Sequence, residues 1–140
     1  MSSNIVQDQL DFMKTGHQHT TGYHMDQEDL YTRLIIEEHG EWLLATLFET
    51  EQNQIKELVD ILVVVLGKII SLGVDPQKAW DLVYANNMLK VTGKVVKDDN
   101  GKIIKSPEAI AAKAKMMREL EDLLPIYEPT STGSLGDWSE

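Results

Sequence analysis

The chain of 140 residues contains no cysteine, which excludes a disulfide framework and a thiolate nucleophile and favours a reducing compartment such as the cytoplasm. Long apolar runs are also missing. The longest, Ile61 to Leu72, is interrupted by Gly67 and Lys68 and is well short of the roughly 20 residues that a membrane span needs. The opening MSSNIVQDQLDFM lacks the basic stretch and apolar core of a signal peptide. We therefore expect a soluble, cytoplasmic protein with no membrane partner.

Positive charge is scarce, because 13 lysines and arginines stand against 23 acidic residues, giving a net charge of −10. This balance argues against a nucleic acid polymer as partner. A small anionic substrate would need help from a metal ion and from local lysines. The length suits one domain, which we place at residues 1–125. Residues 126–140 are rich in Pro, Gly, Ser and Thr and are predicted to form a flexible tail.

Apolar periodicity and capping signals predict an all-α fold, a bundle of four to five helices built on an antiparallel helix hairpin. Asp75-Pro76 and Ser106-Pro107 are typical helix starts. Between the last two helices, Asn100-Gly101 lies between two apolar pairs and predicts a small loop or β-hairpin near residues 94–105. The expected helices are Asn4 to Lys14, Asp26 to Phe48, Gln52 to Leu72, one from Pro76, and one from Pro107 to Pro125.

The stretch from Leu34 to Gly67 sets five carboxylates inside two otherwise apolar helical segments. Residues three or four apart share a helix face, and the short polar connection at 49–53 should make the two helices antiparallel. Two carboxylates of the first helix should then face two of the second. The five are Glu37, Glu38 and Glu41 in the first segment and Glu57 and Asp60 in the second.

Crowded carboxylates in apolar surroundings are costly unless a cation compensates them. Oxygen-only ligands suit Mg²⁺ or Mn²⁺ better than zinc. The histidines His17, His19 and His24 lack a recognised metal-binding spacing, and a solvated loop that borders a pocket is the better interpretation of their segment.

The third long helix carries Trp80, Val83, Tyr84 and Asn87 on one face, and the two aromatic residues are predicted to lie in the core. An asparagine on such a face needs hydrogen-bonding partners. Lysines follow on this helix and in the loop after it, namely Lys90, Lys94, Lys97, Lys102 and Lys105.

The arrangement E-E-x-x-E in EEHGE followed by E-x-x-D in ELVD resembles the MazG-like all-α nucleoside triphosphate pyrophosphohydrolases. Arg33, NMLK at Asn87 to Lys90 and NGKIIK at Asn100 to Lys105 are similar to segments of the phosphoribosyl-ATP pyrophosphohydrolase-like branch. The resemblance covers roughly Leu10 to Pro107. Asn100 departs from it, because an acidic residue usually precedes that Gly-Lys pair. His39 departs too, at a position that is commonly apolar.

The resemblance implies a Mg²⁺-dependent enzyme, with Mn²⁺ as a substitute, that cleaves a (deoxy)nucleoside triphosphate between the α and β phosphates, as in nucleotide-pool control. It implies Glu37 as the general base that activates water. The implied metal ligands are Glu38, Glu41, Glu57 and Asp60, and the implied substrate-binding residues are Asn87, Lys90, Lys102 and Lys105.

Two other interpretations are weaker. A di-iron carboxylate bundle requires Glu-x-x-His pairs, which these helices do not provide. A non-catalytic acidic helical module that binds a metal ion or a partner remains the alternative to an enzyme. The apolar surface of Ile61 to Leu72 further predicts a homodimer or homotetramer, since one chain should not cover it. The base and sugar of the substrate are not predicted.

Overall fold

A computed structural model describes residues 4–125 of the chain, and within this range the secondary structure is helical. Five α-helices follow one another, which confirms the all-α prediction. The C-terminal tail predicted at 126–140 lies outside the described residues. The helices are α1 (Ile5–Thr15), α2 (Met25–Phe48), α3 (Glu51–Ser71), α4 (Pro76–Lys90) and α5 (Pro107–Asp122).

Side-chain caps fix where four of the five helices begin. The Asn4, Thr50, Asp75 and Ser106 side chains each accept a hydrogen bond from a backbone N–H of the first turn. Such caps satisfy amides that have no partner within the helix. Proline follows the cap in α4 and α5, as the sequence predicted.

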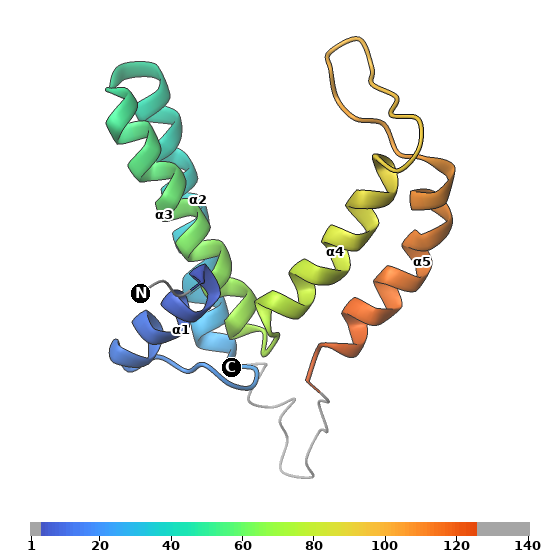
Figure 1. Cartoon of the computed structure of the whole chain (residues 1–140). Helices are drawn as coiled ribbons and strands as arrows, with labels where there is room; N and C mark the ends of the chain where they lie inside the picture. Colours follow the sequence, from blue (N-terminus) through green and yellow to red (C-terminus); the bar gives the residue numbers. More distant parts are fainter. Residues whose placement is uncertain (1–3, 126–140) are drawn as a thin grey trace.

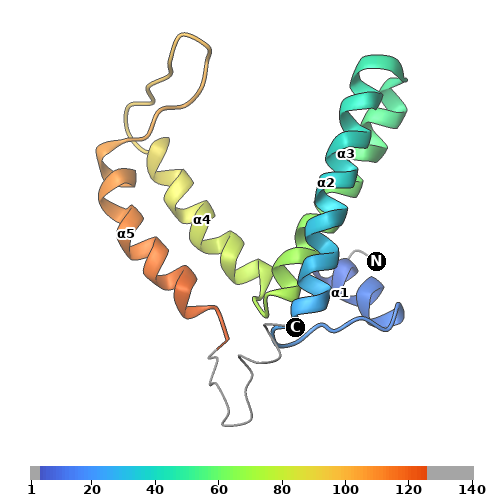
Figure 2. The same ribbon diagram turned by 180° about the vertical axis from the view of Figure 1, so that it is seen from behind.

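The helices form two arms that meet at the turn between α3 and α4, so that the chain has the outline of a V (Figure 1). The antiparallel hairpin of α2 and α3, with α1 packed across its base, makes the first arm. The antiparallel pair of α4 and α5 makes the second. The view from behind shows the same separation of the two pairs (Figure 2).

The buried core lies at the base of the first arm, where α1 meets the hairpin. Met13, Tyr31, Val64 and Ile70 are buried together there. Gly67 makes this packing possible, because a Cβ added to it would lie 2.1 Å from the Tyr31 ring. Further along the arm α2 and α3 cover each other incompletely, and Phe48 is 78% exposed.

The exposed apolar surface differs from the expected one. Within Ile61 to Leu72 most apolar side chains are buried or half-buried inside the chain, because α1 and α2 pack on them. Trp80 and Tyr84 were predicted to lie in the core, yet they are 65% and 52% exposed. The surface that one chain leaves uncovered therefore lies on the outer half of the hairpin and along the second arm.

The segment between α4 and α5 folds back on itself at the end of the second arm (Figure 1). Lys97 and Ile103 form an isolated antiparallel bridge, and the Ile104 N–H donates to the Val96 carbonyl. Asp98 holds the turn, because its Oδ1 accepts from the N–H groups of Asn100 and Lys102. The expected small loop or hairpin near 94–105 is confirmed.

Candidate functional site

Three carboxylates converge between the two long helices. Glu38 and Glu41 stand one turn apart on α2, and Glu57 faces them from α3. One oxygen of each lies within 4.8 Å of the others. The antiparallel hairpin produces this convergence, because it places one face of α2 against one face of α3.

Partial burial makes this group of like charges unfavourable without a cation. Burial and then the neighbouring carboxylates of Glu41, Asp60 and Glu57 together raise the pKa of Glu38 to about 7. Glu38 Oε2 and Glu57 Oε2 are buried and have no hydrogen-bond partner among the described residues. Carboxylate oxygens without donors are the ligands that a hard divalent cation prefers. The donor set therefore fits Mg²⁺ or Mn²⁺.

Asp60 lies at the edge of this cluster. The negative charge of Asp60 acts on Glu38. Its Oδ2 also forms an ion pair with Lys56 Nζ at 2.9 Å. Lys56 Nζ also lies 3.4 Å from Glu57 Oε1. The sequence analysis did not identify Lys56 as a partner of the cluster. Its position four residues before Asp60, on the same helix face, would have indicated the ion pair. The hydrogen bond with Asp60 is the largest cause of a raised Lys56 pKa.

Glu37 is exposed and does not belong to the cluster of three. Glu37 precedes Glu38 directly, so its side chain leaves α2 at about 100° around the helix axis from that of Glu38. Its role as a general base remains a prediction.

The four predicted substrate-binding residues lie on the second arm. Asn87 is exposed and Lys90 half-buried on α4, while Lys102 and Lys105 follow in the exposed segment before α5. The carboxylates belong to the first arm, so one chain does not bring the two sets together (Figure 1).

The asparagine that supports packing on α4 is Asn86, because its Nδ2 donates to the Ala109 carbonyl of α5 at 3.2 Å. The spacing had suggested that Asn87 is a buried amide with hydrogen-bond partners, but Asn86 has this role. Asn87 is left exposed, where a substrate could reach it.

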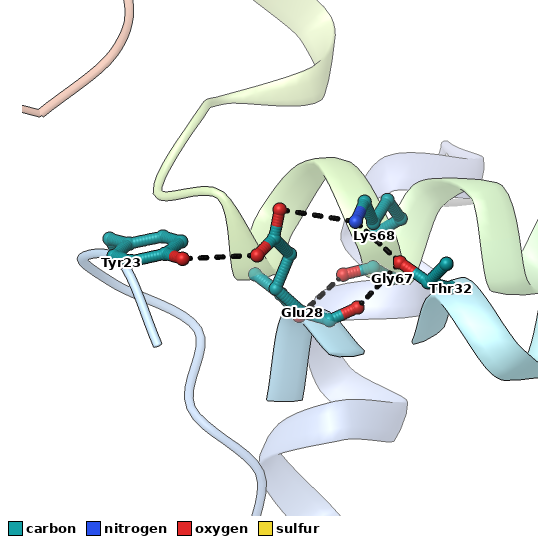
Figure 3. Close-up of polar contacts among 6 residues, drawn as sticks. Tyr23, Glu28, Thr32, Gly67 and Lys68 are labelled. Carbon is teal, nitrogen blue, oxygen red and sulfur yellow. Dashed lines mark hydrogen bonds and ion pairs between the residues drawn. The ribbon is translucent and has the colours of Figure 1, made fainter. Parts of the chain in front are cut away.

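A second polar group, shown in Figure 3, joins the loop before α2 to both long helices. Lys68 Nζ lies 3.1 Å from Glu28 Oε1 and donates to Thr32 Oγ1 at 2.5 Å. Tyr23 donates to Glu28 Oε2, and partial burial together with that carboxylate raises the Tyr23 pKa. These partners satisfy one another, so we interpret the group as a structural clamp at the base of the hairpin.

The histidine loop is held by packing and hydrogen bonds. The rings of His19 and His24 stack with centroids 3.7 Å apart, and Gln27 exchanges two hydrogen bonds with the His19 backbone. Among the described residues the histidines belong to no group with metal-ligand geometry. Residues 16–24 form neither helix nor strand, which agrees with the interpretation of the segment as a loop.

Comparison with known proteins gives a family. The model of the phosphoribosyl-ATP pyrophosphohydrolase family matches residues 9–87, which is more than half of the chain and includes every residue of the carboxylate cluster. A comparison with curated proteins finds no match. No helix in the described range is long and apolar enough to cross a membrane. The chain therefore belongs to the phosphoribosyl-ATP pyrophosphohydrolase family, in the MazG-like superfamily of all-α nucleoside triphosphate pyrophosphohydrolases.

Proposed function

We propose that this protein is a Mg²⁺-dependent pyrophosphohydrolase that cleaves a (deoxy)nucleoside triphosphate between the α and β phosphates. Nucleoside monophosphate and pyrophosphate are the products. The observation that carries the proposal is the convergence of Glu38, Glu41 and Glu57 within 4.8 Å, with two buried oxygens that have no donor within residues 4–125. The family supports hydrolysis of an acid anhydride.

In this proposal the carboxylates have two roles, binding the cation and activating the attacking water. Glu38, Glu41, Glu57 and Asp60 hold the cation, and Asp60 exchanges its contact with Lys56 for it. The cation, when bound, neutralises triphosphate charge and stabilises the charge that develops on the attacked phosphoryl group. Glu37, exposed beside the cluster, orients the attacking water and accepts its proton.

The second arm supplies the phosphate-binding groups. Lys90, Lys102 and Lys105 hold phosphate oxygens, and Asn87 bonds a phosphate or the sugar. Because these residues lie on the other arm of the V, we propose that they reach the carboxylates of a second copy in a homodimer or homotetramer. The exposed apolar faces of both arms, which include Phe48 and Trp80, support such an assembly.

A screen for pyrophosphate release tests the proposal. Canonical and modified triphosphates are offered with Mg²⁺, with Mn²⁺ and with EDTA, and the expected result is turnover of at least one nucleotide that needs the cation. Glu38→Gln and Asp60→Asn should abolish release and weaken Mg²⁺ binding in calorimetry. Turnover of no triphosphate, or unchanged metal affinity in both variants, would refute the proposal.

A further inference from the structure

Lys56 brings a positive charge to the carboxylate cluster. Its Nζ lies 2.9 Å from Asp60 Oδ2 and 3.4 Å from Glu57 Oε1, and both oxygens belong to proposed metal ligands. The other ion pairs found within residues 4–125 lie elsewhere on the molecule. The Lys56 ammonium therefore compensates part of the negative charge that a bound cation would compensate.

A divalent cation and the Lys56 ammonium compete for the same oxygens. The ammonium donates hydrogen bonds but has no lone pair to offer to a metal ion, so it cannot become a ligand. Two positive charges a few ångströms apart repel each other. When Glu57 and Asp60 bind the cation, Lys56 must therefore leave them.

The exposure of these side chains indicates where the ammonium can go. The Lys56 side chain is 65% exposed, whereas those of Glu57 and Asp60 are 13% and 32% exposed. The ammonium thus stands on the solvent side of the ligands, from which a substrate approaches the cation. Phosphate oxygens of that substrate carry the charge that pairs with a lysine.

We propose that Lys56 is a phosphate-binding residue of the first arm, which pairs with Glu57 and Asp60 when no cation is bound and with a phosphate oxygen of the substrate when the cation is in place. The proposal rests on the proposed function, since it assumes that a cation and a triphosphate bind at the cluster. It adds a phosphate-binding group on the same arm as the metal ligands to the lysines of the second arm.

Two titrations of Lys56→Met test this exchange, because their results should change in opposite directions. In calorimetry, Mg²⁺ alone should bind about two- to fivefold more tightly, since the competing ammonium is gone and exposed ion pairs have roughly this strength. Inorganic tripolyphosphate, added at saturating Mg²⁺, should bind about tenfold more weakly, which corresponds to the loss of one charge-assisted hydrogen bond. A merely structural role of Lys56 would weaken the binding of both ligands.

Two control variants accompany the test. Lys56→Arg keeps the positive charge, so both affinities should stay closer to the wild type than those of Lys56→Met. Lys115→Met removes a lysine from the same kind of helical ion pair, formed with Glu119 four residues later on α5. It should leave both affinities unchanged. Lys56 and Lys115 are both largely exposed, so none of these substitutions removes a packed side chain.

Two results would overturn the inference while the proposed function stands. An unchanged or weaker affinity of Lys56→Met for Mg²⁺ would mean that the ammonium does not compete with the cation. An unchanged affinity for tripolyphosphate would mean that Lys56 does not contact the phosphates. A wild type that binds both ligands but turns over no triphosphate would refute the proposed function alone, and a wild type that binds neither would refute both.

Discussion

The α2–α3 hairpin and the α4–α5 hairpin have the same antiparallel design but differ in what they bury. The first covers Tyr31, Val64 and Ile70 with help from α1. In the second, Pro76 and Ala109 are the buried residues of the two helices, while Trp80 and Ile110 are 65% and 60% exposed. The second arm is held instead by hydrogen bonds such as Ser106 Oγ to the Leu89 carbonyl at 2.7 Å.

The two arms also differ in the charge that they would offer to a phosphorylated substrate. The first concentrates carboxylates between its helices, and the second ends in a lysine-rich segment at 94–105. A cation site and phosphate-binding groups are complementary parts of one reaction. The base of the first arm has a buried core of its own, whereas the outer half of that arm and the second arm expose apolar residues such as Phe48 and Trp80. We propose that a second copy covers these surfaces.

The loss of activity should be greatest when the first arm loses one of its proposed metal ligands. Glu57→Gln removes one of the three converging carboxylates and should lower pyrophosphate release by at least about 100-fold, since even groups that only support metal ligands cost 10–100-fold. Glu119→Gln on the second arm is the control, because Glu119 contacts only Lys115 among the described ion pairs. Comparable losses in the two variants would remove the functional distinction between the arms.

Mixing two inactive variants tests whether the arms of different copies cooperate. Glu57→Gln disables the first arm, and Lys102→Ala with Lys105→Ala disables the second. In a dimer that re-forms at random, half of the molecules are mixed and each keeps one intact site, so about a quarter of the wild-type activity should return. The measurement is pyrophosphate release after the two proteins are unfolded and refolded together.

A mixture of Glu38→Gln with Glu57→Gln is the matched control, since both changes disable the same arm and no intact site can form. A failure of the first mixture to regain activity would contradict the sharing of sites between copies. A monomer of 15.8 kDa in sedimentation at micromolar concentration would contradict it too.

The packing of the first arm can be tested with two glycines of its helices. Gly67→Ala places a methyl group against the Tyr31 ring and should destabilise the protein by about 1–3 kcal/mol, as overpacked cores do. Gly40→Ala meets no atom within 4 Å and should stabilise the monomer by about 0.5–1 kcal/mol, because alanine is the better helix former.

The melting temperatures of both glycine variants measure these effects. In a chain of this size each kcal/mol changes the melting temperature by several degrees. If Gly40→Ala destabilised the protein instead, a second copy or a ligand would have to approach α2 at this position. Such a result would show that α2 is covered at this position in the assembly.

Much of the first arm could be predicted from the sequence because its signals are local. Helix periodicity, the spacing of Glu38 from Glu41 and the spacing of Glu57 from Asp60 each depend on residues a few positions apart. The pairing of Asp60 with Lys56 was missed although it too is local. The apolar face of α2 against α3 also followed from pattern alone.

The burial of the second arm was not predictable in the same way. A face that carries Trp80 and Tyr84 has the pattern of a core face, but the pattern does not say which element covers it. The division into two arms depends on the turn from α3 to α4, where Gly73 adopts a φ of 84°. The burial of Gln9 on α1 gave no signal either, because it results from the packing of α1 on α3.

The smallest expected effect is a change in how the stability of the metal-free protein depends on pH. The pKa of Glu38 rises from 4.5 to about 7 on folding, chiefly through burial. Between these pH values the folded state binds more protons than the unfolded state, so this residue makes the protein less stable as the pH rises from 4.5 through 7.

The side chain introduced by Glu38→Gln cannot ionise, so this variant should lose that part of the pH dependence. Thermal unfolding in EDTA at pH 5 and pH 8 should therefore show a larger drop for the wild type than for the variant, by a few degrees. Since groups outside the cluster contribute equally to both profiles, parallel profiles would mean that the acidic cluster is not buried, and this part of the first arm would then be as open to solvent as the second arm.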